Sequence, residues 1–128
     1  MLQRIRPNER TIATAQTAGM RREAAISPDT VGSRGLWAGF VETGPALCSD
    51  AHHHGEAESG IYVLKGRLRF AFGDKLEHSL EAQPGDFIYV PPMTVHVEEN
   101  LDPDQPAEVI VFRNATDALV VNVPDPRA

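Results

Sequence analysis

The chain has 128 residues, 41 % of them apolar, and a formal net charge of −6, which is enough for one domain with one hydrophobic core. No run approaches the ~18 apolar residues that a membrane helix needs, and the charged start lacks the apolar stretch of a signal peptide. The single cysteine, Cys48, excludes an internal disulfide, so we expect a reducing, cytoplasmic location away from membranes.

Charge is distributed unevenly along the chain. The first 22 residues hold five arginines against one glutamate, a net +4, whereas the remainder holds seven basic and 17 acidic residues, a net −10. The acidic body argues against nucleic acid as the main partner, because phosphate contacts need clustered Lys and Arg. The basic start favours a segment that packs on the acidic body or on a second subunit over an arm that binds nucleic acid.

The predicted elements divide the chain into an N-terminal arm (1–30), a β domain (31–124) and a tail (125–128). In the arm, "TIATAQTAGMRREAA" (11–25) fits a short helix or an extended segment, and "SPDT" (27–30) fits a turn. The predicted strands that follow cover 35–42, two runs within 61–74 hinged at Gly66, 75–82, 87–90, 94–99, 107–114 and 118–123.

These short runs have Gly or Pro at nearly every junction, which is typical of an all-β sandwich or barrel. Exposed sheet edges invite pairing with other chains unless they are covered. An N-terminal arm laid across a partner would cover them, so we expect a homodimer.

The stretch "AHHHGEAESG" (51–60) raises the question of a metal site. On a strand, His52 and His54 project to the same face, and His96 in "TVHVEE" is the candidate for a third imidazole. His78 is a competitor, but it alternates with two leucines, which favours a partly buried structural role. A solvated, histidine-rich loop is the plain alternative for the triplet.

The region from Gly44 to Asn100 resembles the cupin family. The first cupin motif has a glycine, H-x-H, a glutamate and a closing glycine, and here His52 to His54 and Gly66 fill those positions. The second motif, G-x5-P-x-G-x2-H-x3-N, matches from Gly85 through Pro91 and His96 to Asn100, with Met93 in place of its second glycine. That replacement suggests a turn without positive φ. The resemblance implies a jelly-roll-like β-barrel.

The resemblance further implies a divalent transition metal (Fe, Mn, Zn or Ni) held by His52, His54, His96 and the motif glutamate. Counting forward from His54 puts the glutamate at Glu58, whereas counting back from Gly66 puts Ser59 there, on the opposite face of the strand. A bulge at Gly60 would turn Glu58 inward. We rank Glu58 first as the fourth ligand, then no protein carboxylate, then Glu56.

Other polar residues have weaker claims to a role. Cys48 and Asp50 share the parity of the histidines, so an unbroken strand would point both into the barrel, where Cys48 is more plausible as a small buried residue than as a ligand. Glu56 and Asp50 are weak candidates for a general base. A substrate carboxylate would call for one inward-facing arginine, and Arg67, Arg69 and Arg113 lie on predicted strands, although an outer face is commoner.

The sequence therefore predicts a metal-binding cupin that acts on a small polar metabolite bound inside the barrel, as a dioxygenase-, isomerase- or lyase-like enzyme. A non-catalytic small-molecule-binding or sensor module is the alternative, because no nucleophile or acid–base pair stands out. A metal-free barrel with a histidine-lined pocket is the third possibility.

Overall fold

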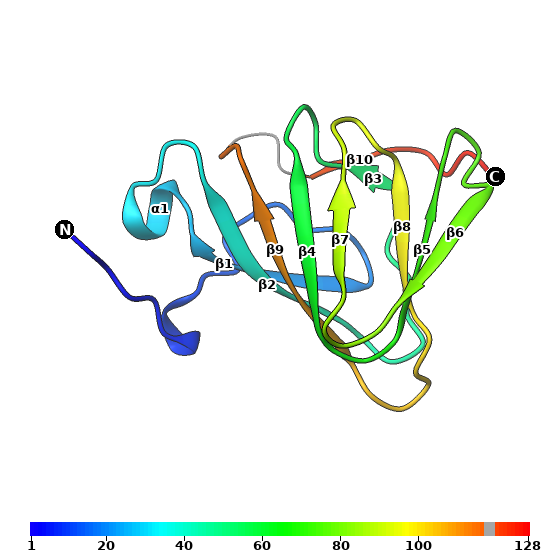
Figure 1. The fold of residues 1–128 in the computed structure, drawn as a ribbon, viewed down its shortest axis with the longest axis horizontal. Helices are drawn as coiled ribbons and strands as arrows, with labels where there is room; N and C mark the ends of the chain where they lie inside the picture. Colours follow the sequence, from blue (N-terminus) through cyan, green and yellow to red (C-terminus); the bar gives the residue numbers. More distant parts are fainter. Residues whose placement is uncertain (117–119) are drawn as a thin grey trace.

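The computed structural model describes residues 1–116 and 120–128 and consists of two five-stranded antiparallel sheets that face each other (Figure 1). This confirms the predicted all-β, jelly-roll-like architecture. Sheet A has the order β1 (Met20–Ile26), β2 (Trp37–Thr43), β9 (Ala107–Arg113), β4 (Ser59–Lys65) and β7 (Phe87–Val90). Sheet B has the order β10 (Val121–Asn122), β3 (His52–His53), β8 (His96–Asn100), β5 (Leu68–Phe72) and β6 (His78–Ala82).

The core lies between the two sheets and follows from the alternation of the strands. In β2 and β9, and in β4 from Ser59 to Val63, every second residue is buried, because successive side chains on a strand point to opposite faces. Ile61, Val63 and Leu68 are fully buried at 0 % exposure. These three strands thus give sheet A a continuous apolar inner surface over most of its length.

Gly66 is the hinge where the chain leaves sheet A for sheet B, as predicted. It lies between β4 and β5 with φ +93°, and a Cβ there would approach the Cβ of Ala107 to 3.0 Å. Glycine takes this left-handed conformation without a steric cost. The hinge allows one continuous segment to contribute a strand to each wall of the barrel.

In the N-terminal region residues 20–26 form β1, the edge strand beside β2, so the extended alternative holds for this part of the arm and the helix does not. The alternation was hidden because Arg22, a residue normally exposed, takes one of the two fully buried positions of this strand. The preceding residues pack on the same sheet through the Arg10–Glu23 ion pair (2.9 Å) and the Thr11–Ala24 bridge. The basic start therefore contacts the acidic body of its own chain.

Smaller differences concern the helices and the C-terminal region. The expected turn at 27–30 is a four-residue helix, α1 (Pro28–Val31), capped by the Ser27 side chain, and a 3-10 helix, η1, spans Pro7–Glu9. Within the strand expected at 118–123, residues 118 and 119 lie outside the described residues. No helix in the described parts of the chain has the length and apolar character to cross a membrane. The homodimer and the cytoplasmic location stay predictions.

Candidate metal centre

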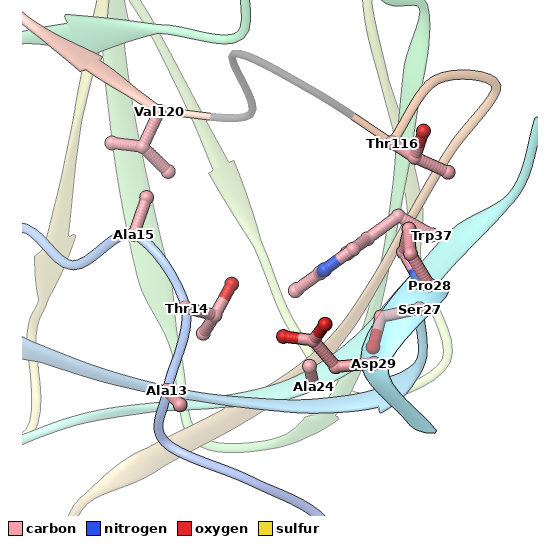
Figure 2. Close-up of a pocket in the computed structure, with 10 residues that line it drawn as sticks. All are labelled: Ala13, Thr14, Ala15, Ala24, Ser27, Pro28, Asp29, Trp37, Thr116 and Val120. Atoms are coloured by element: carbon pink, nitrogen blue, oxygen red, sulfur yellow. The ribbon is translucent and has the colours of Figure 1, made fainter. Parts of the chain in front are cut away.

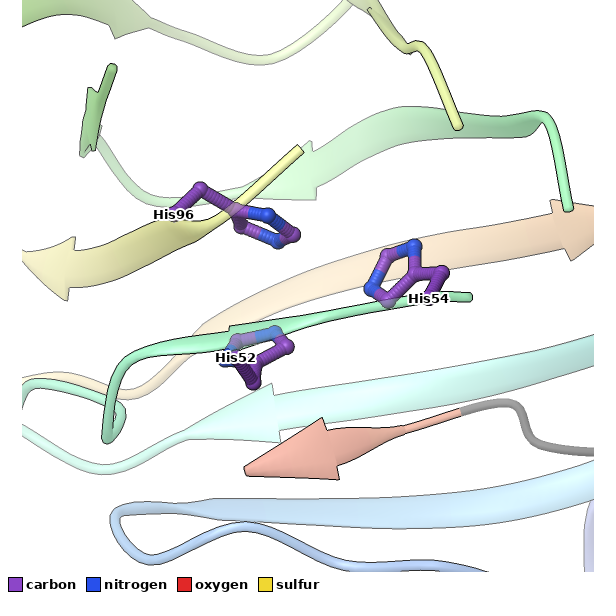
Figure 3. Close-up of side chains that lie close together, drawn as sticks. All are labelled: His52, His54 and His96. Atoms are coloured by element: carbon purple, nitrogen blue, oxygen red, sulfur yellow. The ribbon is translucent and has the colours of Figure 1, made fainter. Parts of the chain in front are cut away.

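Three buried histidines meet on the inner face of sheet B (Figure 3). His52 of β3 pairs directly with His96 of β8 in the antiparallel register, so their side chains project side by side. His54 follows two residues after His52 and faces the same way. The potential ligand atoms of the three rings all lie within 4.8 Å of one another, and the residues are 0 %, 2 % and 3 % exposed.

Each imidazole is anchored through its Nδ1 atom. Nδ1 of His52 donates to the carbonyl of Asp50 (2.8 Å), and Nδ1 of His96 donates to the carbonyl of Thr94 (2.9 Å). Nδ1 of His54 bonds the hydroxyl of Ser59 at 2.8 Å. Because a carbonyl only accepts, the Nε2 atoms of His52 and His96 carry the lone pair. Metal-binding histidines in proteins are oriented in this way.

The protonation state of the cluster also suits a metal. Burial is the main cause that lowers the pKa of His52 to about 3, with the neighbouring His96 as the next contribution. Burial, followed by the charge of Arg113, also places the pKa of His54 far below its ordinary value. Both rings are therefore neutral at physiological pH, and only a neutral imidazole can ligate a metal. The donor set fits a divalent transition metal.

Glu58 does not join the histidines, which corrects its expected place in the metal shell. Glu58 is exposed, and its carboxylate accepts from the Tyr89 hydroxyl (2.7 Å) on the outer side of sheet A. β4 starts at Ser59 and its one register shift lies at Val63/Lys65, not at Gly60, so Ser59, Ile61 and Val63 face inward and Glu58 faces outward. The count back from Gly66 was therefore the correct one.

The other predicted polar residues also lie outside the cluster. Asp50 and Glu56 are exposed, and Asp50 acts on His52 through its main-chain carbonyl only. Cys48 is exposed, because the chain is not an unbroken strand before β3 and makes only an isolated bridge at this point. His78 is 65 % exposed rather than partly buried, because β6 is the edge strand of sheet B.

Met93 is a further correction. Its φ is +60°, the left-handed conformation that the motif glycine would take, and its N–H donates to the carbonyl of Gly55 (2.7 Å). The turn before β8 therefore keeps the shape expected for the motif although its residue is not glycine.

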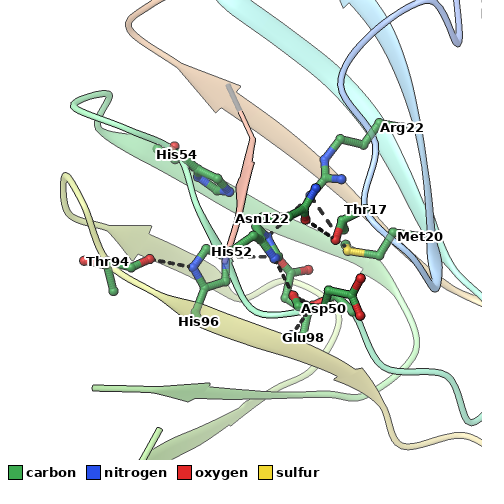
Figure 4. A network of polar contacts seen from close by, with 12 residues as sticks. Thr17, Met20, Arg22, Asp50, His52, His54, Thr94, His96, Glu98 and Asn122 are labelled. Carbon is green, nitrogen blue, oxygen red and sulfur yellow. Dashed lines mark hydrogen bonds and ion pairs between the residues drawn. The ribbon is translucent and has the colours of Figure 1, made fainter. Parts of the chain in front are cut away.

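Glu98 is the carboxylate that sequence reasoning missed. It is 2 % exposed, and Oε1 lies 3.5 Å from Nε2 of His96 (Figure 4). Burial acts to raise the pKa of Glu98, but its contact with His96 and the charge of Arg22 outweigh it, so the pKa lies below its usual value. The signal was available in "HVEE", because a residue two positions after an inward-facing histidine also faces inward.

Two arginines are buried beside the cluster. Nη2 of Arg22 lies 3.4 Å from Nε2 of His52, a long contact with the atom that is free to bind a metal. Arg113 is 2 % exposed and fills the interior position considered for an arginine, whereas Arg67 and Arg69 have exposed side chains. A metal at His52 requires the Arg22 guanidinium to turn away.

A pocket of about 330 Å³ opens beside His96, between the edge strands β6 and β7. Its wall is mainly apolar and is formed by Phe70, Phe72, Leu80, Ile88, Tyr89, Val90, Pro91, Thr94 and His96. A second cavity, of about 360 Å³, lies between the N-terminal segment and Trp37 (Figure 2), and Asp29 is the one ionisable residue in its described lining. The pocket beside His96 is therefore the better candidate for ligand binding.

Residues 39–113 match the Cupin_2 family, described as "Cupin domain". The chain belongs to the cupin family. Its architecture is similar to that of the polyketide cyclase RemF from Streptomyces resistomycificus, with a TM-score of 0.77 and 22 % identity over 99 % of this chain and 91 % of that chain. No curated protein matches the chain in sequence.

Oxalate decarboxylases share the fold as well. A structure of the Bacillus subtilis enzyme that addresses its Mn(II) centres has a TM-score of 0.75 and 19 % identity, over 91 % of this chain but only 30 % of that chain. The Lactobacillus farciminis enzyme, in a formate complex, has a TM-score of 0.73 and 15 % identity, over 85 % of this chain and 32 % of that chain. At these identities the likeness shows the fold alone. This cupin thus combines the family fold with a buried three-histidine cluster that is able to hold a metal.

Proposed function

We propose that this cupin is a small metalloenzyme in which His52, His54 and His96 hold one divalent transition metal beside an organic substrate. The observation that carries the proposal is the cluster itself, with three buried rings, each anchored at Nδ1, and ligand atoms within 4.8 Å of one another. Imidazole ligands suit zinc, iron and nickel, and the Mn(II) centres named for the Bacillus subtilis oxalate decarboxylase add manganese to the candidates.

A metal bound there would supply a Lewis acid that polarises a substrate carbonyl. The protein's contribution would be the proton transfer. Glu98 is buried and ionised beside His96, which suits a general base that removes a proton next to that carbonyl. This assignment favours isomerase- or lyase-like chemistry over dioxygenase chemistry, and it gives Glu98 the role first considered for Asp50 and Glu56.

The pocket beside His96 would receive the body of the substrate. Its aromatic and aliphatic wall favours a ligand with an apolar portion, with its oxygen atoms directed to the histidines. This changes the expected small polar metabolite to a small molecule with one polar end and one apolar end. An apolar portion packed against this wall would exclude water from the proton transfer.

A non-catalytic binding module is the second candidate. Glu98 is the one buried carboxylate among the described residues, and a proton that is removed in a reaction must usually be returned by a positioned acid. A site with one such group therefore also suits a protein that holds a ligand without turning it over.

The first experiment is metal analysis of the protein purified without a histidine tag. We expect about one equivalent of a transition metal per chain and its loss on treatment with a chelator at neutral pH. Protein that contains no metal and takes up none of Fe²⁺, Mn²⁺, Zn²⁺ or Ni²⁺ would contradict the proposal in favour of a metal-free barrel.

The second experiment separates enzyme from binder. Phenylpyruvate has an aromatic ring for the pocket and an acidic C–H next to a carbonyl, so exchange of its C3 protons in D₂O can be followed by NMR. We expect accelerated exchange with the metal-loaded protein and a fall of about 100-fold in that acceleration for Glu98→Gln. Binding of the ligand without accelerated exchange would support the non-catalytic module.

A further inference from the structure

Arg113 lies at the same height as the histidine cluster, on the opposite wall of the barrel. The strand register of sheet A places Trp37, Arg113, Ser59 and Val90 side by side in one row across β2, β9, β4 and β7. All four face inward and are buried. Ser59 bonds His54, and Val90 lines the pocket beside His96. With strands about 4.8 Å apart, Arg113 is about 10 Å from Val90 along the row, within reach of a bound small molecule.

The guanidinium of Arg113 has no hydrogen-bond acceptor in the described parts of the chain. Its Nε, Nη1 and Nη2 atoms are all buried and all unpaired. Burial lowers the pKa of Arg113 to about 9, with the charge of Arg22 as the next cause, so the group is still a cation at neutral pH. A buried cation without acceptors is rare, because its desolvation is not compensated.

Arg22 has a similar deficit. Its Nε and Nη1 atoms are buried and unpaired among the described residues, and Nη2 contacts only Nε2 of His52 (3.4 Å) and Sδ of Met20 (3.8 Å). A metal at His52 would occupy the first of these contacts. Metal binding would therefore leave a second guanidinium in the interior that needs an acceptor.

The charge of the interior leads to the same conclusion. Arg22 and Arg113 contribute two positive charges and Glu98 one negative charge, and these are the buried charged residues of the described chain. The two buried guanidiniums therefore outnumber the one buried carboxylate among the described residues, and a divalent metal would add to this positive excess. A low-dielectric interior does not hold such an excess without a counter-charge.

A purely structural role for Arg113 explains only part of its surroundings. Its guanidinium lies over the ring of Trp37 at 4.6 Å, a cation–π contact that stabilises the charge. The ring offers no hydrogen-bond acceptor of the usual kind, and Nε, Nη1 and Nη2 stay unpaired beside it. Two N–H groups in that fork match the two oxygens of a carboxylate.

We propose that the ligand of this barrel is an organic carboxylate, held by the guanidinium of Arg113 with Arg22 as a second positive group, and with its apolar part in the pocket beside His96. The proposal deepens the proposed function by naming the substrate class, and it rests on that function for the role of the metal. The anion preference itself comes from the two arginines, so it is expected in the metal-free protein and is stronger once a metal is bound.

The test uses calorimetric titration of the full chain, both metal-free and Zn²⁺-loaded, with phenylacetate, its neutral isostere phenylacetamide, and inorganic phosphate. We expect phenylacetate to bind at least tenfold more tightly than phenylacetamide and more tightly than phosphate. Arg113→Met should remove that preference, whereas Arg69→Met, which deletes an exposed arginine of β5, should leave it unchanged. Thermal melts establish that each variant is folded.

The proposal also predicts the melting temperatures of these proteins. Without ligand, Arg113→Met should melt no lower than the wild type, because it removes an unpaired buried charge, and phenylacetate should raise the melting temperature of the wild type but not of the variant. Equal binding of phenylacetate and phenylacetamide by the wild type would overturn the proposal, and so would tighter binding of phosphate. An unchanged preference in a folded Arg113→Met variant would overturn it as well. A protein that binds no metal but still prefers phenylacetate would contradict the proposed function and leave the anion site supported.

Discussion

The two sheets of the barrel differ in how their buried polar side chains are paired. On sheet B each imidazole is fixed by a short hydrogen bond at Nδ1, whereas Nε2 of His52 and of His96 makes only a long contact, with Arg22 (3.4 Å) and Glu98 (3.5 Å). On sheet A the guanidiniums of Arg22 and Arg113 are almost entirely unpaired among the described residues. The first arrangement orients the nitrogen atoms that would bind a metal. The second leaves buried positive groups without a hydrogen-bond acceptor.

This difference suits the binding of two ligands, a metal and an anion, by two different kinds of site. The histidines of sheet B are preorganised, because their rings are oriented whether or not a metal is present. Arg22 and Arg113 of sheet A gain hydrogen-bond acceptors only when an anion binds, so the unpaired cations destabilise the ligand-free protein. The two walls therefore respond differently to substitution.

The largest expected effect is the loss of metal binding in His96→Ala. Removal of one of three nitrogen ligands from the cluster should weaken Zn²⁺ binding by more than about 100-fold, which exceeds the effect of changing a group that only orients a ligand. Competition with a chromophoric chelator measures the affinity. His78→Ala is the matched control, because His78 is an exposed histidine of edge strand β6, and equal losses in the two variants would mean that the cluster is not the metal site.

The two candidate carboxylates can be separated by a pair of conservative variants. Glu98→Gln should lower Zn²⁺ affinity by about 10- to 100-fold, because it removes the one negative charge next to His96. Glu58→Gln should leave the affinity unchanged, because that side chain bonds Tyr89 on the outer face. The same chelator competition decides, and a loss confined to Glu58→Gln would restore the motif glutamate as a ligand.

Ser59→Ala tests the anchoring of the histidines of sheet B. Loss of the hydroxyl that bonds Nδ1 of His54 should reduce Zn²⁺ affinity by about tenfold, because the ring loses its preferred orientation. Ser79→Ala, on the exposed part of β6, is the control. An affinity equal to that of the wild type would show that packing alone orients His54.

The last expected effect is a pH dependence of the stability of the metal-free protein. His52 has a pKa of about 3 when folded and an ordinary value of 6.5, so between these values the unfolded chain binds a proton that the native state does not. The free energy of unfolding should therefore fall by about 1.4 kcal/mol for each pH unit below 6.5 on account of this group. Above pH 6.5 its contribution is complete and constant.

Urea unfolding at pH 7, 6 and 5 measures this slope, and His52→Gln isolates the group from the carboxylates that titrate in the same range. The variant should show a smaller loss of stability between pH 6 and pH 5 than the wild type. Identical slopes would mean that the pKa of His52 is the same in the folded and unfolded chain, so that burial does not keep this ring neutral.

Much of the fold and half of the site could be predicted from the sequence. Alternation predicted most of the strands after residue 31 but not the short β3, Gly66 indicated the hinge, and the motif spacing of His52, His54 and His96 predicted the cluster. The strand at Met20–Ile26 was missed, because a strand pattern assumes apolar inner residues and Arg22 is a polar one. Glu58 was placed wrongly because a change of one residue in register reverses the face of a strand.

The sequence by itself determined a β-barrel of the cupin type with a histidine cluster. Alternation and motif spacing are local properties, and on a strand they fix the face of the sheet to which each side chain points. What only the tertiary structure decided was the setting of that cluster. Glu98 beside His96, Ser59 behind His54 and Arg113 on the opposite wall come together through pairing between strands far apart in the chain. The pairing and burial of a charged side chain depend on neighbours from distant parts of the chain, so no local sequence pattern predicts them.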